Sequence, residues 1–151
     1  MAHSIKLQVQ SIILPTISPL GTETETIDDL VEHTSLEFPI DYIQEKNVQI
    51  IATEVTALGV SGPLWAWVEL SPVASTTSTA YWAAIGGGGG DIVPTTPTIV
   101  PATGVSLTVH TFMLQWTTHS PFARVVIQTP VAAALPLAVW LVQVVVGGKS
   151  P

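Results

Sequence analysis

Short segments rich in β-branched and aromatic residues recur along the chain, separated by clusters of proline, glycine and serine. Alternating or continuous apolar residues within these segments are typical of strands, and about seven strands are expected. They span residues 5–14, 47–58, 64–72, 79–85, 105–118, 122–129 and 137–146. The 151 residues contain no internal repeat. We therefore predict a single all-β domain, residues 1–151, built as a β-sandwich or jelly roll.

One short helix is predicted in the acidic stretch TETETIDDLVEHTSLEF. Thr26 is a suitable N-cap, and Asp28 and Asp29 would lie in the first turn, where the helix dipole favours negative charge. Ile27, Leu30 and Val31 have the spacing of one helix face. We expect about two helical turns here.

Two details of the strands are also predicted. The turn GVSGP separates segments 47–58 and 64–72, which are expected to form a hairpin. In VSLTVHTFMLQW the apolar residues occupy odd positions up to Val109 and even positions from Phe112. This change of parity predicts a β-bulge near His110, with Val109 and the odd positions before it on the buried face.

Charge is distributed very unevenly along the chain. Twelve of the 15 charged residues lie at or before Glu69, and only Asp91, Arg124 and Lys149 follow it. Charged residues make up 10% of the chain, against about 25% in ordinary soluble domains. Such a surface is difficult to expose to water, so we expect copies of the chain or another protein to cover the C-terminal half. The last strand, apolar on both faces, is expected to have the core on one side and a partner on the other.

Composition excludes several classes of function. The chain has no cysteine, which excludes disulfides, thiolate metal sites and a cysteine nucleophile. Four basic residues in a chain of net charge −7 do not favour nucleic-acid binding. The apolar run 131–148 is interrupted by Pro136 and Gln143, which does not favour a membrane helix. The opening MAHSIKLQVQ does not resemble a secretory signal, so synthesis in the cytoplasm is expected.

The stretch IGGGGGDIVPTTPTIVPATG is interpreted as a long connection within the domain, residues 86–104. It lacks the Lys-Ser/Thr ending of a phosphate-binding loop. Long connections without secondary structure are often functional, and we interpret this one as an arm that contacts a neighbouring subunit. A plain surface loop is the alternative. The candidate assembly-arm residues are Gly86, Gly90, Pro94, Pro97 and Pro101.

Motifs for catalysis and metal binding are weak. Asp29 and His33 would share a face of the predicted helix and could hold a divalent metal, but a solvated, capped helix is the simpler and preferred explanation. His110, His119 and a carboxylate such as Glu69 would supply part of a hydrolytic triad, yet no G-x-S-x-G motif surrounds a serine. We therefore predict no catalytic residues, no metal and no cofactor.

Aromatic residues form the strongest candidate binding surface. In GPLWAWVELSP, strand alternation places Trp65, Trp67 and Glu69 on one face, and Tyr81 and Trp82 would extend it. Three interpretations remain open: a platform that stacks a sugar, a contact surface for another protein, or a second packed face of the sandwich.

These observations predict a structural subunit of a large symmetric assembly. A virion component, such as a phage capsid, decoration or tail protein, is favoured because release by lysis requires no signal peptide. Its expected partners are copies of itself and other structural proteins of the particle, without nucleic acid or membrane, and its expected location is the virion. The alternative is a lectin-like carbohydrate-binding module that uses the Trp/Trp/Glu face.

Overall fold

The computed structural model describes residues 8–15, 24–28, 31–39, 45–55, 62–74, 81–84, 98–100, 103–114, 120–129 and 139–149. These ranges contain eleven strands and no α-helix. The strands are β1 (Gln8–Leu14), β2 (Glu25–Ile27), β3 (His33–Thr34), β4 (Phe38–Pro39), β5 (Glu45–Val55), β6 (Leu64–Ser71), β7 (Ala83–Ala84), β8 (Thr98–Val100), β9 (Thr108–Leu114), β10 (Phe122–Gln128) and β11 (Val139–Lys149). Each of the seven predicted segments contains a strand. The additional strands β2, β3, β4 and β8 are too short to show a period in the sequence.

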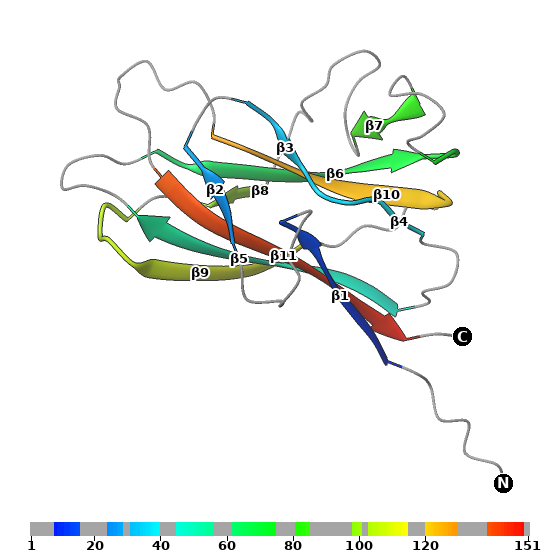
Figure 1. Ribbon diagram of the computed structural model, residues 1–151, viewed down its shortest axis with the longest axis horizontal. Helices are drawn as coiled ribbons and strands as arrows, with labels where there is room; N and C mark the ends of the chain where they lie inside the picture. Colours follow the sequence, from blue (N-terminus) through cyan, green and yellow to red (C-terminus); the bar gives the residue numbers. More distant parts are fainter. Residues whose placement is uncertain are drawn as a thin grey trace, which may run out of the picture.

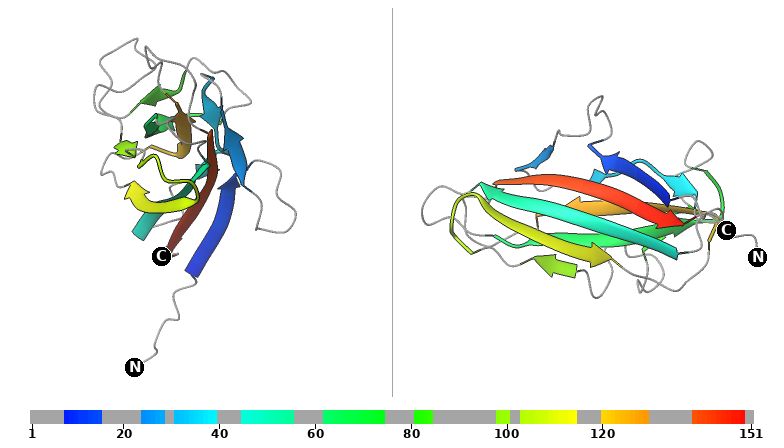
Figure 2. Two further views of the ribbon diagram at one scale, coloured as in Figure 1. Left: turned by 90° about the vertical axis from the view of Figure 1, so that its left-hand side faces the viewer. Right: turned by 90° about the horizontal axis from the view of Figure 1, so that it is seen from below.

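The strands form two antiparallel sheets that face each other as the layers of a sandwich (Figure 1, Figure 2). Sheet A has the order β1-β11-β5-β9, and β2 also pairs with β11. Sheet B has the order β3-β10-β6-β7, with β4 beside β10 and β8 beside β6. The fold is therefore nearly all β and consistent with the predicted β-sandwich.

The hydrophobic core lies between the two sheets. β5 and β11 are the longest strands, with 11 residues each, and they pair over their whole length. On β5, Val48, Ile50 and Ala52 point inward and are fully buried, while the residues between them lie on the outer face. On β11, Trp140 is the largest fully buried side chain. Full burial of an aliphatic side chain such as Ile50 contributes roughly 1.5–3 kcal/mol.

The predicted hairpin of β5 and β6 is wrong. β5 lies between β11 and β9 in sheet A, whereas β6 lies beside β10 in sheet B. Both strands are therefore central, with partners on each side, and the connection between them crosses from one sheet to the other. A turn motif in the sequence cannot distinguish a hairpin from such a crossover, because both need the same local breaking residues.

The predicted helix at Thr26 is also wrong. Thr26 lies in the middle of β2, which pairs with residues Trp140 to Val142 of β11. Ile27 stands opposite Trp140 and is fully buried. A helix of about two turns is marginal in water, so burial of Ile27 beside β11 outweighs the favourable N-cap.

The predicted bulge near His110 is absent from the described strand. β9 pairs with β5 in an unbroken register from Val48↔Leu114 to Glu54↔Thr108. The even-numbered residues of β9 face inward, whereas Val109 is 59% exposed. The parity of the apolar residues does not identify the buried face, because apolar residues occupy outward positions of β9 as well as inward ones. The residues before Thr108 belong to a turn, in which Leu107 has a φ of 64°.

The remaining expectations concern the arm and the apolar run. The five candidate arm residues lie outside the described residues, and only β8, Thr103 and Gly104 of the 86–104 connection are described. Within the described part of the chain, no helix has the length and apolar character needed to cross a membrane. The described end of the apolar run is strand β11, in which Val144 faces the core and Val145 lies on the opposite side.

Candidate functional site

The first candidate surface is the outer side of sheet B. Leu64, Ala66, Val68 and Leu70 of β6 belong to the core cluster, so the residues between them point away from the core. These outward residues are Trp65, Trp67 and Glu69, the face that strand alternation predicts. Trp67 and Glu69 are each only 3% exposed. Side chains on the outer side of this sheet are thus themselves packed rather than open.

An ion pair holds this group of side chains together. Arg124 of β10 stands directly opposite Glu69 in the strand register, and its Nε and terminal nitrogen lie 2.7 Å and 2.6 Å from Glu69 Oε2. Trp67 Nε1 donates to Glu69 Oε1 at 3.4 Å. The Arg124 guanidinium also lies 4.4 Å from the centre of the Trp82 ring, a cation–π contact. We call these four residues, Trp67, Glu69, Trp82 and Arg124, together with Trp65 farther along the same face of β6, the tryptophan cluster.

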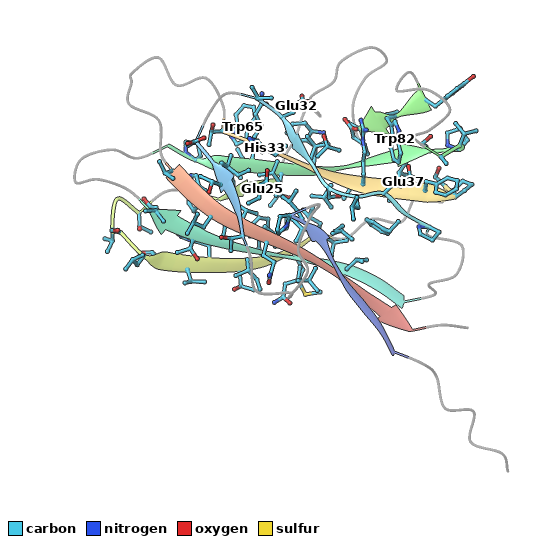
Figure 3. The ribbon with its side chains drawn as sticks, in the orientation of Figure 1. Glu25, Glu32, His33, Glu37, Trp65 and Trp82 are labelled. Carbon is cyan, nitrogen blue, oxygen red and sulfur yellow. The ribbon has the colours of Figure 1, made fainter. Side chains whose placement is uncertain are left out.

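Glu32, labelled in Figure 3, adds a second carboxyl group that interacts electrostatically with Glu69 and Arg124. Burial raises the pKa of Glu32 above its usual value, and the negative charge of Glu69 raises that pKa further, while the positive charge of Arg124 opposes both effects. Glu69 was predicted for this surface from the sequence, whereas Glu32 and Arg124 were not. The available signal for Arg124 was that it is the only basic residue between Lys46 and Lys149.

Two indole groups of the tryptophan cluster carry unused donors. The Nε1 atoms of Trp65 and Trp82 are buried and make no hydrogen bond; Figure 3 labels both residues. A buried donor left unpaired costs about 1–3 kcal/mol. Because both donors are covered, a sugar would reach them only if the structure opened. Among the five residues predicted for this surface, Tyr81 is the most exposed, at 50%. The lectin-like hypothesis therefore stays a prediction, and little exposed aromatic surface supports it.

The residues considered for metal binding and catalysis do not form a site in the described structure. His33 lies on β3 and contacts Glu25 Oε1 at 3.2 Å, whereas Asp29 and His119 lie outside the described residues. His110 faces the core, where its ring packs against Trp140 at 5.6 Å. Across the described ranges, no group of three or more histidine, aspartate or glutamate side chains is placed to hold a metal ion.

A buried carboxylate that sequence analysis missed organises one end of sheet A. Glu54, near the end of β5, is fully buried. Its carboxylate accepts hydrogen bonds from Thr103 N at 2.9 Å, Thr103 Oγ1 at 2.8 Å and Gly104 N at 2.8 Å. His110 Nε2 lies 3.8 Å from the same carboxylate. Glu54 thus holds the turn of residues 103–107 against the sheet; the only sequence signal was a lone acid within an apolar strand.

The second candidate surface is the outer side of sheet A. Its members are the outward residues from Gln49 to Val55 of β5, those of β9, and those from Val139 to Val145 of β11, and none of them is charged. Glu45 and Lys149, which stand opposite each other at the far ends of β5 and β11, are charged and are not part of this surface. We call this surface the uncharged face: Gln49, Ile51, Thr53, Val55, Val109, Thr111, Met113, Val139, Leu141, Gln143 and Val145. Val109 and Met113 are 59% and 49% exposed. Exposed apolar side chains that lie together are typical of an interface with another protein.

No protein-family model matches the sequence, and no curated protein is significantly similar to it. The two surfaces therefore have to be compared by their own chemistry. In the tryptophan cluster, the Glu69 carboxylate is occupied by Arg124 and Trp67. The uncharged face instead presents apolar, hydroxyl and amide groups across three strands, and it is the better candidate for contact with another molecule.

Proposed function

We propose that this protein is a structural subunit of a large symmetric assembly, of the kind that builds a virion, and that it associates with copies of itself through the uncharged face. The observation that carries the proposal is the absence of charge from the outward residues within 49–55 of β5, 109–113 of β9 and 139–145 of β11, which define this face. The virion context rests on composition, since the chain is poor in charge and contains no cysteine.

The chemistry of the face determines what drives association. A typical stable interface buries about 800 Å² on each partner, and each Å² of apolar surface removed from water contributes about 25 cal/mol. Valine, isoleucine, leucine and methionine supply the apolar area of the uncharged face, and threonine and glutamine supply hydrogen bonds. A contact of this composition needs no ion pairs, in keeping with the scarcity of charge after Glu69.

Acidic residues lie at the opposite edge of the sandwich. Glu25 and Asp28 are in or beside β2, and Glu32 and Glu37 flank β3 and β4. These strands are the neighbours of β11 and β10 on the side away from β5 and β6. The arrangement leaves the charge that keeps a subunit soluble away from β9.

Negative-stain microscopy and light scattering of the purified protein test the proposal. We expect particles of defined shape and a mass many times that of the chain, which is 15.9 kDa. A stable monomer at tens of micromolar would show that the uncharged face does not associate, and the proposal would have to be abandoned.

A further inference from the structure

Among the described strands, β9 forms an edge of sheet A. In Figure 2 it is the outermost strand beside β5, and β5 is its only strand partner in the described part of the chain. An edge strand presents a row of backbone N–H and C=O groups that are available to pair with another strand.

The sequence of β9 contains none of the features that normally protect an edge. Residues Thr108–Leu114 include no lysine, arginine, aspartate, glutamate or proline, and the register with β5 is unbroken. The opposite edge of sheet A is formed by β1, whose pairing with β11 has a register shift between Ile12 and Leu14, a device that also protects edges, and by the three-residue β2, which contains Glu25. On the same side, sheet B ends in the two-residue strands β3 and β4, and Pro39 lies in β4. Short strands, charge and proline prevent edge pairing. The opposite edge is therefore protected from pairing with another strand, whereas β9 is not.

We propose that β9 pairs antiparallel with β9 of a second copy about a two-fold axis at Thr111, joining two copies of sheet A into one continuous sheet. This proposal rests on the proposed self-association and names the first contact between two copies of the chain. Residue 111 is the midpoint of β9, so this register uses all seven residues of the strand. It sets each Thr111 opposite the Thr111 of the second copy.

The side chains favour this register over its neighbours. On the outer face, Val109 stands opposite Met113 of the second copy, so apolar residues meet apolar residues. On the inner face, His110 stands opposite Phe112 of the second copy, and cross-strand aromatic pairs stabilise sheets. Moving the two-fold axis by one residue would place Thr111 opposite Val109 or Met113, and fewer residues of the two strands would pair. The pattern of β9 is thus complementary to itself, as a two-fold contact requires.

The turn before β9 adds to the same surface. Val105 and Leu107 are 62% and 70% exposed, and Leu107 has a φ of 64°, a conformation that is uncommon for residues with a side chain. Leu107 N donates to the Glu54 carbonyl at 2.6 Å, and the Glu54 carboxylate holds Thr103 and Gly104. Exposed apolar side chains are therefore held in place before association, which lowers the entropy lost when they become buried.

Charge substitution tests whether the β9 edge is the contact. The double variant Val109→Lys/Met113→Lys places charge at the edge, where its outward positions are exposed enough to leave folding intact. The matched control is Val31→Lys/Leu36→Lys, because these residues are 62% and 48% exposed and lie near the opposite edge. We expect the concentration needed for association to rise at least about tenfold in the β9 variant and to stay unchanged in the control. Circular dichroism checks that both variants fold.

Cysteine cross-linking tests the register itself, because the chain contains no cysteine. In the proposed dimer the two Thr111 Cα atoms are about 4.5–5.5 Å apart, within the range of about 4.4–6.8 Å that a disulfide spans. Thr111→Cys should therefore form a disulfide-linked dimer on mild oxidation, and Thr53→Cys on the adjacent strand should not. Val109→Cys should not cross-link with itself, since the two positions are about 13 Å apart along the strand, but should cross-link with Met113→Cys in a mixture.

The outcomes separate this inference from the proposed function. Edge pairing is refuted if the wild-type protein and the lysine variant at β9 both assemble and Thr111→Cys forms no disulfide-linked dimer. Another part of the uncharged face would then mediate assembly. Cross-linking of Val109→Cys alone, without Thr111→Cys, would refute the register. A wild-type monomer would overturn both proposals.

Discussion

At the scale of single residues, the buried carboxylates of this protein are paired or hydrogen-bonded to residues that are distant in the sequence. Glu69 pairs with Arg124, and Glu54 holds Thr103 and Gly104 through its carboxylate. Each carboxylate is nearly or fully buried, and a buried charge is tolerated only when it is paired or hydrogen-bonded. Removal of one partner is thus expected to be more damaging than the modest net contribution of an exposed ion pair suggests.

Glu32 gives a pH-dependent prediction at this scale. Burial, and then the charge of Glu69, raises its pKa above the usual 4.5, so the folded state holds the Glu32 proton more tightly than the unfolded state. The stability that this proton contributes is fully present below pH 4.5 and is lost as pH rises through the raised pKa. We therefore expect Glu32→Gln to gain stability relative to the wild type as pH rises from 4 to 7. Urea unfolding at several pH values measures this; a difference independent of pH would contradict it.

At the scale of elements, strand β11 has one face in the core and the other on the uncharged face. Val142 and Val144 are fully buried in the core, whereas Leu141 lies on the uncharged face and is partly exposed. The sequence LAVWLVQVVV is apolar on both faces, so the side that meets the core is decided by pairing with β5 and β1.

Aspartate substitutions on β11 separate folding from assembly. Val144→Asp buries an unpaired carboxylate in the core, which costs several kcal/mol, and we expect it to unfold the domain. Leu141→Asp places the same group on the uncharged face, so we expect a folded chain that no longer assembles. Circular dichroism reports folding and light scattering reports assembly. Equal loss of folding in the two variants would show that Leu141 belongs to the core rather than to an interface.

At the scale of the whole molecule, the sandwich is polarised. Glu25, Asp28, Glu32 and Glu37 lie along the β2, β3 and β4 edge, away from the uncharged face and β9, whereas Glu54 beside β9 is buried and hydrogen-bonded. Of the 11 acidic residues, all except Asp91 lie at or before Glu69. Subunits that meet through β9 thus place their acidic edges far apart, which limits repulsion between them.

This polarity predicts how assembly responds to salt. At 1 M salt the Debye length is about 3 Å, so ion pairs at exposed contacts are screened. Because the proposed contact is apolar and hydroxyl-rich, we expect assembly to persist at 1 M salt or to strengthen as repulsion among acidic edges falls. Light scattering across a salt series measures it. Dissociation at high salt would mean that ion pairs drive assembly.

Local pattern in the sequence was enough to predict the seven main strand segments and the all-β fold, because the alternation of side chains and the breaking effect of proline and glycine act between near neighbours. It also placed Trp65, Trp67 and Glu69 on one face of a strand. Only the tertiary structure decided that β5 and β6 belong to different sheets, that Ile27 completes a strand, and that Glu69 and Glu54 find partners 55 and 49 residues away. Those outcomes depend on strand order and register, which are set when distant segments pack into a common core, and no short-range pattern encodes them.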